Sequence, residues 1–165
     1  MTIVVHRHGS GPGEALIAGW EVGDDVRVCR WSSARGFRWA TDGRPVVLLG
    51  DASVISLAMS VRDRATVERR TALIVLEVDV HDVDAARGLV PGAVVVAAGD
   101  EPGRALDAWL EQHGGQIAEL ADPVVYLAGH GQSIQRQRDH LRHARGLDRK
   151  QVRTQPYWAT GKTGL

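Results

Sequence analysis

The residues best suited to chemistry follow two short apolar runs, and the first group is Gly50-Asp51-Ala52-Ser53, directly after residues 46–49. This pattern predicts a buried strand that turns into a helix over residues 54–61. The first N–H groups of a helix lack partners within it, and the helix dipole is positive there. A phosphate or carboxylate could therefore bind this turn through its amides and Ser53. Alternatively, Ser53 could simply cap the helix.

The second group is Gly129-His130-Gly131, which follows the apolar run at residues 124–128. A histidine at a strand tip titrates near neutral pH and could act as a general acid or base. We therefore name His130 as the catalytic candidate, although a surface-loop histidine without a role would give the same pattern. No carboxylate or cysteine completes a metal set with the histidines of residues 140–143, so we predict no metal site.

Aromatic and glycine-rich segments at the two ends of the chain supply further candidates. Tyr157 and Trp158 end a predicted strand and could stack on a flavin or nicotinamide ring, or cap the core, with Trp158 the better ligand candidate. His8 and Gly9 open a loop with three glycines and a proline, which could be the remnant of a pyrophosphate-binding loop.

The elements that must position these residues alternate along the chain. Strands followed by helices predict an α/β fold, a Rossmann-like parallel sheet with helices on both faces and ligands at the carboxyl ends of the strands. Residues 1–45 do not show this alternation of strands and helices: the sequence predicts a helix at 14–20 and an irregular stretch at 32–45. We therefore divide the chain into residues 1–45 and 46–165. The expected strands are 3–5, 26–29, 46–49, 71–78, 93–98, 124–128 and 152–157. The expected later helices are 54–61, 101–113 and a basic segment ending at Arg145. The helix at 54–61 is apolar on nearly every side, so we expect it to be sandwiched between other elements.

Composition narrows the function classes. The 165 residues suffice for a sizeable core, and the single cysteine, Cys29, cannot form an internal disulfide. No run approaches the ~20 apolar residues of a membrane span, and no secretory leader is visible, so we expect a cytoplasmic protein. The net charge is zero, but residues 131–165 hold eight basic and two acidic side chains. This basic third suits an anionic small molecule or an acidic partner, and no motif favours nucleic acid.

In these residues the chain resembles the siderophore-interacting proteins, which are flavin-dependent ferric-siderophore reductases of the ferredoxin-reductase-like superfamily. The motifs that carry the resemblance follow one another in the family's order over nearly the whole chain. They are His8-Gly9, Gly11-Pro12-Gly13, Trp20, Gly23-Asp24, residues 48–53, Ala128-Gly129-His130, the arginine-rich segment 136–145, Gly146-Leu147 and Tyr157-Trp158.

The resemblance implies a flavin-binding β-barrel, of which residues 1–45 would be a short remnant, followed by an NAD(P)H-binding α/β domain. It implies that Gly50, Asp51 and Ser53 contact a cofactor phosphate and that Gly129 lies beside the nicotinamide. Arg104 would bind another phosphate. NAD(P)H and FAD are thus the cofactors to expect, although a protein that binds neither is an alternative.

The chain also departs from the family pattern. It begins where the barrel is almost finished, the family's glutamate after Ala-Gly is His130, and Ala52 replaces an acidic residue. We therefore expect a degenerate reductase domain that still binds a nucleotide, as a homodimer or with a partner reductase chain. The alternatives are a cofactor-independent cyclase, isomerase or binding protein of a biosynthetic pathway in secondary metabolism, and an accessory redox subunit.

Overall fold

The computed structural model describes residues 12–25 and 37–162. Its strands are β1 (Val46–Asp51), β2 (Ala72–Val78), β3 (Val94–Ala97), β4 (Val124–His130) and β5 (Val152–Trp158). Its α-helices are α1 (Pro12–Ala18), α2 (Ile55–Val67), α3 (Val83–Leu89), α4 (Arg104–His113), α5 (Gly115–Ala118) and α6 (Gly131–His143), and two short 3-10 helices are η1 (Ala52–Val54) and η2 (Val80–Asp82).

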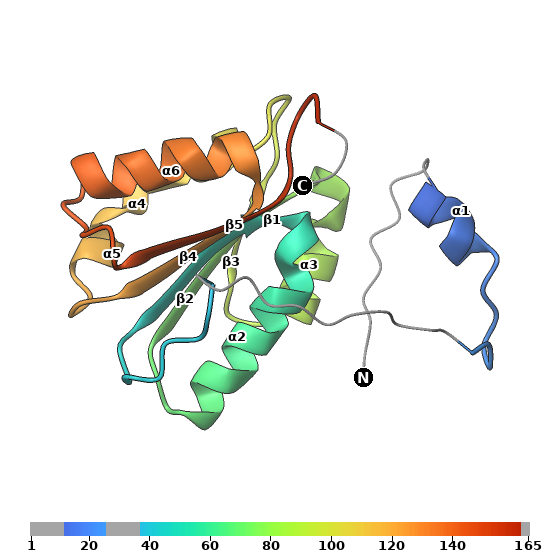
Figure 1. Cartoon of the computed structure of the whole chain (residues 1–165), viewed down its shortest axis with the longest axis horizontal. Helices are drawn as coiled ribbons and strands as arrows, with labels where there is room; N and C mark the ends of the chain where they lie inside the picture. Colours follow the sequence, from blue (N-terminus) through green and yellow to red (C-terminus); the bar gives the residue numbers. More distant parts are fainter. Residues whose placement is uncertain (1–11, 26–36, 163–165) are drawn as a thin grey trace.

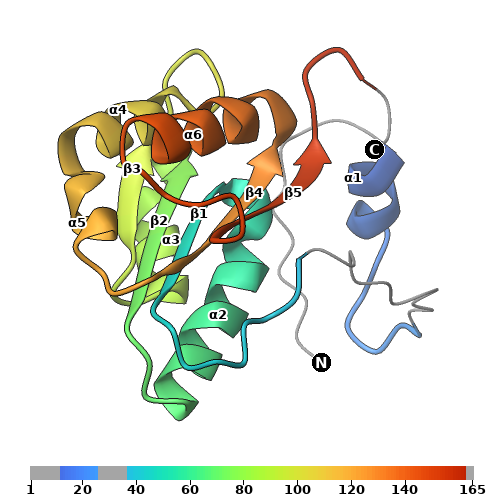
Figure 2. The ribbon, with the colours of Figure 1, turned by 60° about the vertical axis from the view of Figure 1, so that its left-hand side comes forward.

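Within the described residues, five strands form one parallel sheet in the order β3-β2-β1-β4-β5. Figure 2 shows all the arrowheads pointing the same way, so the carboxyl ends of the strands share one edge. The chain order reverses between β1 and β4, which is the position where open α/β sheets bind ligands. Every residue of β4 is buried, as expected for a central strand covered on both faces.

Helices cover both faces of the sheet, as the sequence predicts (Figure 1). On one face, alternate residues such as Leu48, Leu76 and Tyr126 pack with α2 and α3. On the other, Leu49, Val75 and Leu127 pack with α4 and α6. The period-two pattern of the strands thus separates two apolar cores. No helix among the described residues is both long and apolar enough to cross a membrane.

The expected elements from residue 46 onward are confirmed, with shifts at their ends. Strand β4 continues through Gly129 to His130, where a register shift against β5 accommodates the glycine's φ of +110°. Helix α4 begins at Arg104 rather than residue 101, because Gly103 has a left-handed φ of +80°. Helix α2 runs past residue 61 to Val67. The expected sandwiching of residues 54–61 is wrong, because Ala58 and Val61 are buried whereas Ser56 and Ser60 are exposed.

The expected helix at residues 14–20 is observed as α1, two residues earlier. Helices α3 and α5 were not expected. The strands expected at residues 3–5 and 26–29 lie outside the described residues, and the barrel remnant and the division at residue 45 stay predictions.

Residues 37–45 have neither helix nor strand and pack against the α2 face of the sheet. Buried Tyr126 holds them, because its hydroxyl accepts a hydrogen bond from Ala40 N at 2.8 Å and donates to Arg38 O at 2.9 Å. The Arg70 guanidinium also donates to the carbonyl oxygens of Ala40 and Arg44. Two side chains of the α/β unit therefore fix the course of the preceding segment.

We expect Tyr126→Phe to lower the free energy of unfolding by about 1–3 kcal/mol, since it leaves the buried Ala40 amide without an acceptor. Urea denaturation measures this change. Tyr157→Phe is the matched control, because Tyr157 is 41% exposed, and we expect it to alter stability by less than about 0.5 kcal/mol. Equal effects of the two substitutions would contradict the role assigned to the Tyr126 hydroxyl.

Candidate functional site

The tips of β1 and β4 meet at two glycines. Gly50 pairs with Ala128, and a Cβ atom at Gly50 would lie 2.4 Å from the Val54 side chain and 2.7 Å from Ala128 O. At Gly129, a Cβ atom would lie 2.4 Å from Asp51 Oδ2. Both positions therefore need glycine, because the backbone of one strand closely approaches the turn of the other.

The Asp51 carboxylate accepts hydrogen bonds from four donors. Oδ1 accepts from Ser53 N at 2.9 Å and Ser53 Oγ at 2.5 Å, and Oδ2 accepts from His130 N at 2.8 Å and Trp158 Nε1 at 3.0 Å. The turn is thus capped by Asp51 rather than by Ser53. The amide and hydroxyl of Ser53 that we expected to face a phosphate are engaged by a carboxylate from the same turn.

His130 is buried, with 5% of its surface exposed, so the surface-loop alternative is wrong. Nδ1 lies 2.7 Å from Ser133 Oγ, and Nε2 lies 3.0 Å from Thr160 Oγ1 and 3.3 Å from Thr160 N. Ser133 Oγ donates to Pro102 O at 2.7 Å, so it accepts from Nδ1–H, and Nε2 is left to accept from Thr160. The neutral imidazole satisfies every one of these contacts.

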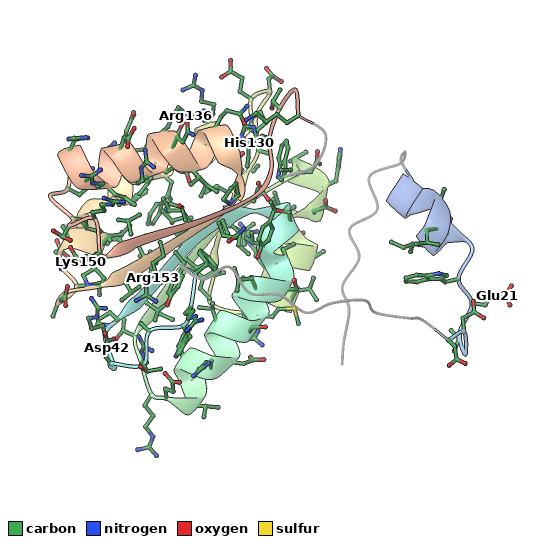
Figure 3. The ribbon with its side chains drawn as sticks, viewed as in Figure 1. Glu21, Asp42, His130, Arg136, Lys150 and Arg153 are labelled. Carbon is green, nitrogen blue, oxygen red and sulfur yellow. The ribbon has the colours of Figure 1, made fainter. Side chains whose placement is uncertain are left out.

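The surroundings of His130 favour its neutral form. Burial lowers the pKa of the ring, and the Arg136 charge lowers it further, while Asp51 and Glu77 act in the opposite direction. Figure 3 shows His130 and Arg136 close together where α6 begins. The Trp158 ring lies 4.4 Å from the imidazole, measured between centroids. The histidine therefore supports Trp158 and the segment around Thr160, and its catalytic role stays a prediction.

A second carboxylate, Glu77, lies near the end of β2 and, unlike the partly exposed Asp51, is buried, with only 3% exposed. Its two oxygens accept from Gly103 N at 2.6 Å and Leu106 N at 2.9 Å, so it caps the start of α4. Sequence reasoning missed this residue, although a lone acid in the apolar run 72–78 was an available signal. It also missed Ser133 and Thr160, whose contacts with His130 depend on the fold.

The space enclosed between these groups is very small. The hollow bounded by β1, β4 and the starts of α4 and α6 has a volume of about 10 Å³, so it has room for at most one water molecule. Gln137 lines it and is buried, and its Nε2 has no hydrogen-bond partner among the described residues. A ligand larger than water must therefore lie above the strand tips rather than between them.

The surface above the strand tips carries aromatic side chains. Trp158 is 40% exposed, held at its indole nitrogen by Asp51 and supported by His130. Tyr157 is similarly exposed, and partial burial together with the Asp51 charge raises the pKa of its hydroxyl. The core covers only part of each of these two rings. Trp158 thus joins Gly50, Asp51, Ser53, Gly129 and His130 in one cluster.

The expected phosphate cation does not join this cluster through its side chain. Arg104 pairs with Glu101 at 2.8 Å and lies 3.8 Å from Asp107, and it lines a separate hollow between α4 and α6. The hydrogen bond from Arg104, and then its charge, lowers the pKa of Glu101. His8 and Gly9 lie outside the described residues.

A larger hollow beside the strand tips is positively charged. It has a volume of about 350 Å³ and lies between α6, β5 and residues 159–162. Its lining includes Arg138 and Lys162 but no carboxylate. Arg138 pairs with exposed Asp139 at 3.0 Å. Nowhere in residues 12–25 and 37–162 are three His, Cys, Asp or Glu side chains arranged to hold a metal ion.

Comparison with known proteins identifies the family. The family model for siderophore-interacting proteins matches residues 44–161, which is more than half of the chain. The chain belongs to this family. No curated relative of the sequence was found.

Solved structures of low sequence identity share the fold. The siderophore-interacting protein from Acinetobacter baumannii has a TM-score of 0.66 and 16% identity over 97% of this chain and 63% of its own length. A siderophore utilization protein from T. fusca has a TM-score of 0.62 and 21% identity over 96% of this chain and 60% of its own length. The ferredoxin-NADP+ reductase from Plasmodium falciparum has a TM-score of 0.64 and 13% identity over 89% of this chain and 65% of its own length. This chain therefore spans less than two thirds of these proteins.

We expect Gly129→Ala to destabilise the fold by roughly 2 kcal/mol or more, because an L side chain is strained at this φ and its Cβ collides with the Asp51 carboxylate. Thermal or urea unfolding measures the effect. Gly99→Ala is the matched control, since its Cβ would meet nothing within 4 Å. Unchanged stability in Gly129→Ala would show that the two strand tips are not tied as described.

The lowered pKa of His130 sets a direction for pH dependence. The unfolded histidine, with a pKa of 6.5, binds a proton before the folded one does. We therefore expect the His130 contribution to the free energy of unfolding to be complete above about pH 6.5 and to fall as the pH drops towards the lower folded pKa.

Urea unfolding between about pH 7.5 and about pH 5 tests this prediction. In His130→Asn, the free energy of unfolding should change less with pH than it does in the wild type. His81→Asn is the control, because His81 is exposed, and it should keep the wild-type dependence of the free energy of unfolding on pH. The same pH dependence in all three proteins would contradict the assignment of this effect to His130.

Proposed function

We propose that this chain is the nicotinamide-nucleotide-binding part of a flavin-dependent reductase. The observation that carries the proposal is the exposed, hydrogen-bonded Trp158 beside the β1–β4 switch point in a member of the siderophore-interacting protein family. A bound nicotinamide would supply hydride chemistry. The flavin would be held by a partner reductase chain or by a second copy of this chain.

Trp158 is the residue suited to binding an aromatic ring. Asp51 holds its indole nitrogen and His130 packs against it, so the side chain is fixed before a ligand arrives. A fixed aromatic side chain loses little conformational entropy on binding, and the partly exposed ring can stack on a planar ligand. Gly50 and Gly129 keep the neighbouring surface free of side chains, which lets a ring approach the backbone.

The anionic part of the nucleotide would lie away from Asp51, whose carboxylate would repel it and already occupies the donors of Ser53. Arg138 and Lys162 line a neighbouring hollow of about 350 Å³ without a carboxylate. Arg104 offers a third cation, and its pairing with exposed Glu101 is weak enough to exchange. The basic last third of the sequence thus gains a role in binding phosphates.

His130 would act by positioning in this proposal. Its ring nitrogens are both engaged, so it would need to release Thr160 before it could exchange a proton with a substrate. Its contacts instead hold Trp158 and residue 160 in place.

A cofactor-independent function is the second candidate. It is favoured by the engagement of Ser53 and by the hollow of about 10 Å³ at the strand tips, which leave no preformed phosphate cradle at the β1 turn. In that case the aromatic surface at Trp158 would bind a neutral small molecule.

Isothermal titration calorimetry with NADPH, NADH, FAD and FMN, each at up to about 1 mM, tests the proposal. We expect a nicotinamide nucleotide to bind, and Trp158→Ala to weaken it by about 10-fold through loss of stacking. Trp158→Phe keeps a ring but loses the bond to Asp51, and we expect it to stay within about 3-fold of wild type. Failure of all four compounds to bind would reject the proposal in favour of the cofactor-independent candidate.

A further inference from the structure

A separate apolar hollow lies on the α2 face of the sheet. It has a volume of about 180 Å³ and is lined by residues from three parts of the chain: Phe37, Trp39, Leu57, Ser60, Val61, Arg64 and Tyr126. The strand-tip cluster borders a different hollow, with no residue in common. Figure 3 shows Arg153, which contacts Tyr126, well away from His130 toward the other end of the strands.

Three aromatic rings form the wall of this hollow. The Trp39 and Tyr126 rings are nearly parallel, at 9° and 6.3 Å between centroids, and Phe37 meets Tyr126 edge-on at 5.2 Å. The Tyr126 hydroxyl is fixed by Ala40 and Arg38, and the Trp39 indole nitrogen donates to Glu68 at 3.0 Å. Aromatic walls held by hydrogen bonds at their edges favour a flat apolar ligand.

The rim of the hollow is positively charged. The Arg64 guanidinium lies 5.0 Å from the Trp39 ring centroid, and Arg70 lies 4.7 Å from it. Both arginines pair with Glu68, whose pKa falls to about 2 because of the hydrogen bonds from Arg64 and then Arg70. Arg70 does not line the hollow: its side chain is 3% exposed and donates to Ala40 O, Arg44 O and Glu68. Arg64 is therefore the cation that the lining of the hollow presents.

Arg64 retains donors that could bind an anion. Its Nε bonds Glu68 at 2.8 Å, whereas its two terminal nitrogens make no hydrogen bond to another described residue. The contact with Trp39 and the bond to Glu68 together orient the planar group. A guanidinium fork with free terminal nitrogens matches a carboxylate in bidentate fashion.

We propose that this hollow binds a small aromatic carboxylate, with the ring against Leu57 and the aromatic wall and the carboxylate on Arg64. The volume is below the ~300 Å³ of sites for drug-sized molecules, so it limits the ligand to about one ring. This inference does not depend on the proposed nucleotide site.

Benzoate and its neutral isostere benzamide are the probes, followed by two-dimensional NMR at the Trp39 indole N–H and by calorimetry. We expect saturable shifts of this resonance, with benzoate binding about 10-fold more tightly than benzamide because a charge-assisted bond is stronger than a neutral one. In Arg64→Gln, benzoate should bind about 10-fold more weakly and the preference over benzamide should disappear.

Arg62→Gln is the matched control, since Arg62 lies on the same helix but does not line this hollow, and it should keep the benzoate affinity. Leu57→Trp should fill the hollow and abolish binding of both probes, with the rest of the NMR spectrum confirming that the protein is folded. No shift at Trp39, or a benzoate preference that survives in Arg64→Gln, would overturn the inference. Neither result would affect nucleotide binding at Trp158.

Discussion

The strand-tip edge of this protein depends on one carboxylate that joins three strands. Asp51 ends β1 and accepts bonds from its own turn, from the backbone at the end of β4 and from the indole at the end of β5. Backbone N–H groups at strand ends lose their partners in the sheet ladder, and a carboxylate can accept several of them at once. The glycines at 50 and 129 follow from this arrangement, because side chains there would block the approach of β4 to the turn.

The same arrangement determines where an anionic ligand can bind. Asp51 and Glu77 place two negative charges at the carboxyl ends of neighbouring strands, and each carboxylate bonds backbone amides that could otherwise bind phosphate. Outside this layer, positive charges lie on Arg104, Arg136, Arg138 and Lys162. A nucleotide would therefore place its ring near Trp158 and its phosphates toward these outlying cations. The sequence instead suggests a phosphate bound at the turn after β1.

The sequence predicts the sheet and the residues of the strand-tip cluster better than it predicts their roles. Apolar runs locate all the described strands, and their shared polarity brings Asp51, His130 and Trp158 to one edge. The observed roles differ from the predicted ones because they depend on hydrogen bonds from His130 and Trp158 to Asp51, which lies 79 and 107 residues away in the sequence. No local sequence pattern contains such pairs. Helix α3, with seven residues, is too short for a clear period, and the contact of His130 with Thr160 requires the chain to return beyond β5.

Strand β4 carries both proposed ligand surfaces, with Tyr126 behind one and His130 at the edge of the other. Energetic coupling between two sites requires an element with two alternative arrangements that both ligands influence. Strand β4 is buried along its whole length and hydrogen-bonded to β1 on one side and β5 on the other, so moving it would break ladder bonds and open the core. A ligand on the α2 face and a ligand above Trp158 should therefore bind with nearly additive free energies, because the strand that they share is held in one position by both neighbours.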